Sequence, residues 1–373
     1  MKQASTEPML STYLHSRGVK LGLPIGGTFE LTARCNFRCP MCYIHSCSEK
    51  AGEIKTELTA AQWIALAREA RDMGMVFALL TGGEPFLRTD FFEIYHAMKA
   101  MGLMISINTN GSLLRGVVLE ELLEDPPTRV NVSLYGASAE TYRRMCGQDA
   151  FETVADNICA LKKGGVDVRI NLSITPQNRN DISCIYEIAR ELDVHIKATS
   201  YMYPPIRVNG GQFGCGARLT PEEAAQCSVA WDKLRLSEEA FAERAKQMRA
   251  LAKTDNEICG ADPEDGIACR AGSSSFWLTW DGRMLPCGML PYPEAYPLRS
   301  GFEEAWHEIR KATKQIRMPR ECGVCEYRPV CAVCPAVCVT ETGCFDKKPD
   351  YLCRMTEATV RLAEEACRIV AER

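Results

Sequence analysis

Short apolar runs and longer amphipathic segments alternate along the first half of the chain. The apolar runs have the length of strands and lie near residues 28–33, 76–80, 103–108, 130–134, 166–174 and 194–198. The segments between them have the 3.6-residue apolar spacing of helices and lie at residues 60–73, 90–101, 113–122, 151–163 and 179–192. This alternation is typical of successive β/α units on a parallel sheet. It predicts an α/β fold, a partial (β/α)6 TIM-like barrel over residues 27–200.

The pattern changes on either side of this barrel. Residues 1–26 form a short N-terminal extension, and residues 201–258 begin as a turn-rich linker and continue into helices, one of them starting at Thr220 and Pro221. From residue 259 the chain is rich in cysteine, glycine and proline. We therefore expect a small cysteine-rich domain over residues 259–373, closed by a helix near residues 356–371.

Candidate chemical groups follow the predicted strands directly. Cys35 follows the first strand, Gly82 the second, residues 108–111 the third and Ser133 the fourth. A β/α barrel carries its active site at these carboxyl ends of the strands. A doubly wound open sheet does the same, so this placement does not distinguish the two architectures.

Composition narrows the class of protein. The chain has 20 cysteines, but its first residues lack the basic start and apolar run of a secretory signal. In a reducing cytoplasm such thiols bind metal more often than they form disulfides. A net charge of −4 and five histidines argue against a nucleic-acid partner and against imidazole-based metal sites. No apolar run is long enough to span a membrane.

The first cysteine motif is CNFRCPMC, which contains Cys35, Cys39 and Cys42 in a C-x3-C-x2-C spacing. Three thiolates can hold a 4Fe–4S cluster and leave one iron open to a small molecule, unlike a fully ligated ferredoxin cluster. Zinc is the alternative, with His45 or Cys47 as a fourth ligand.

This motif resembles that of the radical S-adenosylmethionine (SAM) superfamily. The resemblance implies that the open iron chelates the amino and carboxylate groups of SAM, and that Met41 lies close to the adenine. It also implies that the reduced cluster cleaves SAM to methionine and a 5'-deoxyadenosyl radical.

The second motif, LTGGEP, ends a predicted strand with Gly82, Gly83, Glu84 and Pro85. Taken alone it could be a simple turn, because glycines allow close backbone approach and proline fixes the exit. It is similar to the superfamily motif whose backbone binds the amino group of SAM. The resemblance further suggests SAM contacts for three residues at strand ends, for which turn formation is the alternative: Asn110, Ser133 and Ser173.

A third group of cysteines lies in the C-terminal domain. Cys269 and Cys287 flank a predicted hairpin with an Asp-Gly turn at residues 281–282. Two CxxC pairs and one later cysteine follow, at Cys322, Cys325, Cys331, Cys334 and Cys353. The pairs alone suggest a zinc ribbon, but seven cysteines are too many for one such site.

Their order resembles the SPASM extension of radical SAM enzymes, which binds two auxiliary 4Fe–4S clusters. The resemblance assigns Cys269, Cys287 and Cys334 to the nearer cluster and Cys322, Cys325, Cys331 and Cys353 to the outer one. One ligand of the nearer cluster lacks a clear match. Cys259, Cys338 and Cys215 are the candidates for it, and an open iron is the alternative.

The resemblance implies a cytoplasmic enzyme that modifies a peptide or protein, as the maturases of ribosomal peptides do, by a thioether or carbon–carbon crosslink or by oxidation of a residue. Two alternatives are formylglycine formation, as in anaerobic sulfatase-maturing enzymes, and chemistry on a small-molecule cofactor precursor. A non-catalytic iron–sulfur or zinc protein is a third. We expect flavodoxin or ferredoxin as reductant. The short N-terminal extension predicts that the barrel itself, or a separate peptide-recognition protein, binds the peptide. No catalytic base is assigned.

Overall fold

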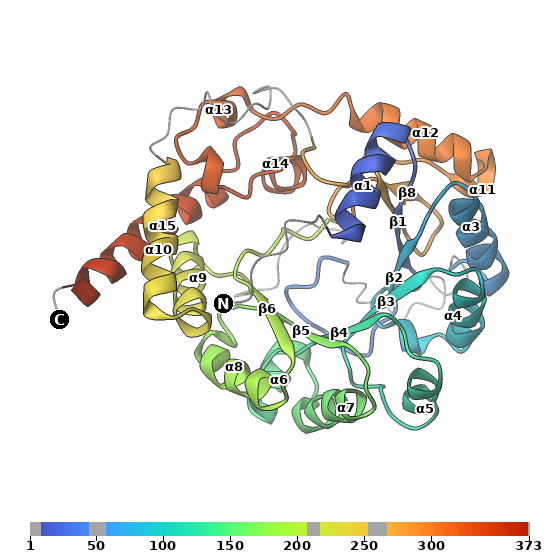
Figure 1. Ribbon diagram of the computed structural model, residues 1–373, viewed down its shortest axis with the longest axis horizontal. Coiled ribbons are helices and arrows are strands. Elements are labelled where there is room, and N and C mark those ends of the chain that lie inside the picture. The colour runs from blue at the N-terminus through green and yellow to red at the C-terminus, as the bar shows by residue number, and fades with distance from the viewer. Residues whose placement is uncertain (1–8, 45–56, 207–216, 253–266, 372–373) are drawn as a thin grey trace. The chain divides into compact units, whose positions relative to one another are not determined.

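The computed structural model describes residues 9–44, 57–206, 217–252 and 267–371 (Figure 1). Each of the six predicted barrel strands is present, and helices separate them in the expected order. The strands are β1 (Gly26–Glu30), β2 (Phe77–Thr81), β3 (Met104–Thr109), β4 (Arg129–Ser133), β5 (Val168–Ser173) and β6 (His195–Thr199). The α/β class of a partial barrel is thereby confirmed.

One compact unit comprises residues 1–35, 48–108 and 267–315. Its strands lie in the order β3-β2-β1-β7-β8, with β7 at Ser275–Leu278 and β8 at Met284–Leu285. β1 pairs in parallel with both β2 and β7, so that Thr28 lies opposite Leu79 and Trp277. The predicted hairpin of β7 and β8 is confirmed. Its pairing with β1 was not predicted, because the sequence suggested that it belongs to the second domain.

Aromatic packing explains this pairing. Phe29 on β1 contacts Trp63 and Phe276 edge to face, with ring centroids 6.0 and 5.8 Å apart. Phe276 in turn lies 5.0 Å from Phe302 and 6.3 Å from Trp306. Each of these side chains is almost completely buried, and burial of such rings stabilises a core strongly. The helices of this unit are α1 (Leu10–Leu21), α3 (Ala60–Asp72), α4 (Phe91–Ala100), α11 (Pro297–Ser300) and α12 (Phe302–Thr313).

The second compact unit comprises residues 36–47, 109–266 and 316–373. Its strands β4, β5 and β6 pair in parallel, and Ile170 lies opposite Val132 and Ile196. Apolar residues of β4 and β5 alternate with Ser133, Asn171 and Ser173, so one sheet face is polar. The helices that follow are α5 (Val117–Glu124), α6 (Ala139–Cys146), α7 (Phe151–Lys163), α8 (Ile182–Glu191), α9 (Pro221–Arg235), α10 (Glu238–Ala252), α13 (Arg320–Gly323), α14 (Pro335–Thr342) and α15 (Asp350–Ala371).

The last helices of this unit pack together. Thr220 caps α9 with a hydrogen bond from the Glu223 N–H, and Pro221 is its first residue, as predicted. The predicted C-terminal helix is also confirmed, but it begins at Asp350 and therefore carries Cys353 in its first turns. α15 packs on α9 and α10 through a buried cluster that contains Val229, Phe241, Ala245, Ala363 and Ala366. Within the described ranges, none of the helices could cross a bilayer.

The burial of His15 on α1 predicts a pH-dependent stability. Its Nδ1 lies 2.9 Å from the Ser274 hydroxyl, and its ring stacks on Phe77. Burial, and then the nearby Arg270, lower the pKa of His15 from 6.5 to about 4. The unfolded chain therefore binds a proton before the folded one, so stability should fall as the pH drops from about 6.5 towards 4.

The measurement is the thermal midpoint at pH 7.5 and pH 5.0. We expect His15→Gln to lose less stability than the unmodified protein between these two values. The control is His307→Gln, since His307 is exposed on α12. Equal losses in the protein and the His15→Gln variant would contradict the assignment.

Candidate functional site

The glycine-rich loop after β2 lies directly along the chain that leads to Cys35. The Leu31 N–H donates to the Thr81 carbonyl at 2.8 Å, and the Gly83 N–H donates to the Thr32 carbonyl at 2.8 Å. The Glu84 N–H then donates to the Arg34 carbonyl, also at 2.8 Å. The pairing of β1 with β2 thus continues beyond both strands, and it places the second motif beside the first residue of the cysteine loop.

The two glycines are required by this close approach of one backbone to another. A Cβ on Gly82 would lie 2.5 Å from the Thr32 carbonyl oxygen, and a Cβ on Gly83 would lie 2.3 Å from that of Arg34. Both distances are far inside van der Waals contact. Gly82 also has a φ of 153°. Both glycines therefore allow the close approach of the chain that leads to Cys35, and their contact with SAM stays a prediction.

The carboxylate of Glu57 fixes the residues on either side of this ladder. It accepts hydrogen bonds from Arg34 Nε and Nη2, each at 3.1 Å, and from the Thr32 hydroxyl. Arg88 Nη1 lies 3.7 Å from Glu57 and donates to the Leu31 carbonyl at 3.0 Å. The Glu57 and Arg88 side chains are 6% and 5% exposed, so this is a buried ion pair at the base of the cysteine loop.

Replacing Glu57 by alanine should therefore destabilise the protein. Arg88 would stay buried with Asp90 as its carboxylate partner, and loss of one member of a buried pair costs about 3 kcal/mol, or roughly 5 °C in thermal midpoint. Asp72→Ala, which removes an exposed ion pair with Arg71, is the matched control and should change the midpoint little. Similar midpoints for both variants would refute the structural role of Glu57.

The second part of the cysteine loop is held by a closed ring of hydrogen bonds. Asn36 Nδ2 donates to the Ser112 hydroxyl at 2.9 Å, which donates to Asn110 Oδ1 at 2.7 Å. Asn110 Nδ2 completes the ring by donating to Asn36 Oδ1 at 2.8 Å. Asn110 was predicted to contact SAM. In the structure its buried side chain joins the end of β3 to the cysteine loop, and the SAM contact stays a prediction.

Cys39 and Cys42 lie beside two groups that the sequence argument did not assign to the site. A hydrogen bond with the Cys146 thiol, and then burial, raise the pKa of the Cys39 thiol well above its usual range. Burial, together with the charges of Cys39, Cys146 and Cys42, raises the pKa of Tyr135 in the same way. The backbone supports this arrangement, because the Arg38 N–H donates to the Cys146 carbonyl at 2.8 Å.

The chemistry of this donor set fits an iron–sulfur cluster. The motif supplies three cysteine side chains, and cysteine thiolates are the ligands of such a cluster. A buried thiol ionises when a bound metal supplies the compensating positive charge, and a coordinating thiol is deprotonated outright. Cys35, Cys39 and Cys42 would then hold the cluster.

Three further predicted SAM contacts have defined positions. Met41 is buried within the loop. Ser133 ends β4 and Ser173 ends β5, and both lie on the polar face of that sheet. Asn178 ties the two strand ends together, since its Nδ2 donates to the Tyr135 carbonyl at 3.0 Å and to the Ser173 carbonyl at 2.9 Å. Their contact with SAM remains a prediction, as it does for Gly82, Gly83, Glu84 and Pro85.

The C-terminal cysteines of the second unit form a cluster of their own. Burial, and then the neighbouring Cys331 and Cys325, raise the pKa of Cys322. Burial raises the pKa of Cys353 to about 11, and Cys331, Cys322 and Cys325 act in the same direction. The four cysteines assigned to the outer cluster therefore lie close enough to influence one another.

Cys338 also belongs to this neighbourhood. It is completely buried, and its pKa is raised to about 12 by burial and by the thiols around it, Cys322 first. Its N–H donates to the Cys334 carbonyl at 3.0 Å. Of the three candidates for the missing ligand, Cys338 is the one the structure describes, because Cys259 and Cys215 lie outside the described residues.

Aromatic side chains connect this cluster to the end of β6. The Tyr203 hydroxyl lies 4.0 Å from Cys334 Sγ, and the Tyr201 and Tyr203 ring centroids are 5.1 Å apart. The Arg218 guanidinium lies 3.4 Å from the ring centroid of Tyr351 and pairs with Glu341. A guanidinium in this position is attracted to the face of the ring by a cation–π interaction.

Cys269 and Cys287 lie in the other unit, on either side of the hairpin, and Cys287 Sγ accepts a hydrogen bond from the Met289 N–H at 3.4 Å. Among the described residues, no three His, Cys, Asp or Glu side chains meet at one point as the ligands of a single metal ion do. A 4Fe–4S cluster binds one thiolate per iron, so its ligands need not meet in that way.

Comparisons with known proteins show which family model, relatives and folds the chain resembles. Residues 29–191 match the family described as "Radical SAM superfamily". A protein of Methanosarcina barkeri named "AdoMet-dependent heme synthase" is 29% identical over 340 residues, which are 87% of this chain and 94% of that protein. The fold is similar to that of Streptococcus suis SuiB bound to precursor peptide SuiA, with a TM-score of 0.67, 15% identity, and coverage of 95% of this chain and 84% of that one. It is also similar to anSMEcpe with bound AdoMet and Kp18Cys peptide, with a TM-score of 0.66, 16% identity, and coverage of 93% and 99%.

Proposed function

We propose that the chain is a radical SAM enzyme in which Cys35, Cys39 and Cys42 hold the 4Fe–4S cluster that cleaves SAM. Its residues 29–191 match the model of the Radical SAM superfamily. Such a cluster, when bound, supplies the electron that converts SAM to methionine and a 5'-deoxyadenosyl radical. The observation that carries the proposal is the ladder from Thr81 to Glu84, which lies against the residues leading into Cys35. Two motifs that stand far apart in the sequence therefore meet where SAM would bind.

The chain's own residues would position SAM and protect the radical. The Glu57 and Arg88 ion pair fixes the start of the cysteine loop, and the ring of Asn36, Ser112 and Asn110 fixes its middle. The partly buried Tyr135 beside Cys39 would help to exclude water from that thiol. A dry, rigid site is what a reactive radical requires, because water and mobile groups would otherwise quench it.

We further propose that the substrate is a peptide or a protein. Two proteins of the same fold have been solved with bound peptides, SuiB with SuiA and anSMEcpe with Kp18Cys. The second group of cysteines, in which Cys322 raises the pKa of Cys353, would accept the electron that the substrate gives up. Flavodoxin or ferredoxin would reduce the first cluster.

A second candidate is a SAM-dependent step of haem synthesis. The full-length similarity to the Methanosarcina protein of that name favours it. The two candidates differ in the molecule that carries the modification, so mass spectrometry distinguishes them. Formylglycine formation, the other alternative, is also a modification of a peptide or protein. In a mass spectrum it would be seen as the oxidation of a single Cys or Ser.

The test is anaerobic reconstitution with iron and sulfide, followed by addition of SAM and dithionite. We expect 5'-deoxyadenosine and methionine in equal amounts. Addition of a candidate peptide, or of a porphyrin precursor of haem, should raise the rate for the true substrate class and change its mass. A protein that binds iron but forms no 5'-deoxyadenosine would refute the proposal.

A further inference from the structure

The strand β6 forms one edge of the sheet of β4, β5 and β6. It pairs with β5 on one side, and the part of the chain that the structure describes places no strand on its other side. The Ile174 N–H donates to the Thr199 carbonyl at 2.8 Å, so the Thr199 backbone faces β5. Along a strand, the N–H and C=O groups of successive residues point to opposite sides. Those of Ile196 and Ala198 therefore point away from β5. No hydrogen bond to them is found among the described residues.

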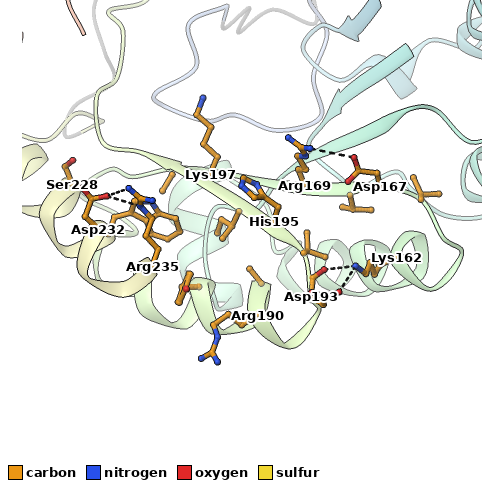
Figure 2. Close-up of a pocket in the computed structure, with 18 of the residues that line it drawn as sticks. Lys162, Asp167, Arg169, Arg190, Asp193, His195, Lys197, Ser228, Asp232 and Arg235 are labelled. Atoms are coloured by element: carbon orange, nitrogen blue, oxygen red, sulfur yellow. Dashed lines mark hydrogen bonds and ion pairs between the residues drawn. The ribbon is translucent and has the colours of Figure 1, made fainter. Parts of the chain in front are cut away.

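A cavity of about 1030 Å³ lies beside this edge (Figure 2). Ile196 and Ala198 line it from the strand, and Tyr186 on α8 and Trp231 on α9 line it from the helices. The Tyr186 and Trp231 rings are in edge-to-face contact at 5.5 Å. One face of any strand added here would therefore meet apolar and aromatic side chains.

The charges around the cavity are mostly positive. Its lining contains six Lys or Arg side chains, one histidine and three aspartates. The cationic ones are Lys162, Arg169, Arg190, Lys197, Arg235 and Arg244. Each aspartate lies within ion-pair distance of cations of this set, as for Asp232 with Arg235 and Arg244 at 2.6 Å and Asp193 with Lys162 at 3.1 Å. Among the lining residues alone, three positive charges remain in excess, counted as six cations less three carboxylates. One of the six cations, Arg190, also pairs with Glu187 at 2.9 Å outside the lining.

Of these cations, Lys197 is the one most available to a bound partner. It is exposed, and no carboxylate partner for it is found in the described ranges. Figure 2 shows its side chain extending away from the labelled aspartates. It lies on the same strand face as His195, opposite in direction to Ile196 and Ala198. The second face of an added strand would therefore meet positive charge.

We propose that the free edge of β6 binds an acidic polypeptide segment, which adds to the sheet as an extended strand. A small anion could use the charges but not the outward N–H and C=O groups, whereas an extended peptide supplies both at the spacing of a strand. Alternating acidic and apolar residues match the two faces described above. This inference rests on the edge and the charges alone and does not require SAM cleavage.

The test uses the reconstituted full chain and a fluorescein-labelled nonapeptide of alternating Glu and Val, with fluorescence anisotropy as the readout. We expect binding that weakens with salt, and at least tenfold weaker binding of the peptide in which Lys replaces Glu. Lys197→Glu should weaken binding about tenfold. Lys311→Glu on α12, which is exposed outside the cavity, is the matched control and should not.

Backbone pairing is tested separately by N-methylation of the peptide, which leaves the protein unchanged. Methylating every second residue removes the N–H groups on one edge of the added strand, and methylating the other set removes those on the opposite edge. We expect one set to abolish binding and the other to bind like the parent peptide. Equal binding of both sets, or equal binding of oligothymidylate, would overturn the proposal in favour of a general polyanion surface.

Discussion

Replacement of Cys35, Cys39 and Cys42 together by alanine should abolish reductive SAM cleavage and remove about four irons per chain, the content of one 4Fe–4S cluster. The three thiols are the only ligands that the chain offers to that cluster in this proposal. Without them, the Thr81 to Glu84 ladder would have no metal centre beside it. The measurement is 5'-deoxyadenosine formed with dithionite, together with iron and sulfide content after anaerobic reconstitution.

The matched control is Cys184→Ala, since Cys184 is an exposed thiol on α8 outside the site. This variant should retain full iron content and full SAM cleavage. If the triple variant still formed 5'-deoxyadenosine, the assignment of the cluster to this loop would be wrong. Iron content equal to that of the unmodified protein would be equally damaging, because it would show that these thiols bind no iron.

Much of the fold could be predicted because barrel strands are short, apolar and regularly spaced. The helix α1 was missed for a physical reason. It exposes Leu10, Tyr13 and Leu21 and buries His15 and Gly18, so its apolar positions point away from the face it buries. A helix prediction from apolar periodicity assumes that the apolar positions face the core. The pairing of β7 with β1 was missed because it joins residues about 250 positions apart, and local patterns contain no such information.

The motifs of the site could be predicted from the sequence, but the residues that contact and position them could not. Glu57 belongs to no recognisable motif, so there was no reason to select it from the sequence. In the structure its carboxylate pairs with Arg34 and Arg88. Cys146 is buried, and its thiol is hydrogen-bonded to Cys39. Tyr135 offered one usable signal. It stands two residues after Ser133, and alternation along the strand would have placed both on the same side.

The C-terminal cysteines illustrate how packing adds to a motif. Their spacing alone left a zinc ribbon open. In the structure, Cys331 and Cys334 pack against a buried cluster that includes Cys322, Cys338 and Leu352. Burial, and then the neighbouring thiols, raise the pKa values of Cys322, Cys338 and Cys353. A metal centre relieves that cost, because it binds the thiolate forms directly. A metal centre would therefore stabilise this thiol array, which supports the proposal of an auxiliary cluster in the second unit.

Replacement of Cys331 and Cys353 together by alanine should remove about four irons per chain, one auxiliary cluster, while the first cluster stays intact. SAM cleavage should persist within several-fold, because Cys35, Cys39 and Cys42 are unchanged. Conversion of the substrate to product should fall to background, because the electron that leaves the substrate would lose its acceptor. The measurements are iron content, 5'-deoxyadenosine and product mass for each variant.

Cys367→Ala is the control, since Cys367 lies on α15 with Cys353 but packs among Val229, Phe241 and Ala363. It should leave iron content, SAM cleavage and product unchanged. A zinc content of about one per chain that disappears in the double variant would identify a zinc site instead. Parallel loss of SAM cleavage and product would show that the array acts on the first cluster and not on the substrate. Separation of the two activities is thus the result that assigns the array to the electron leaving the substrate.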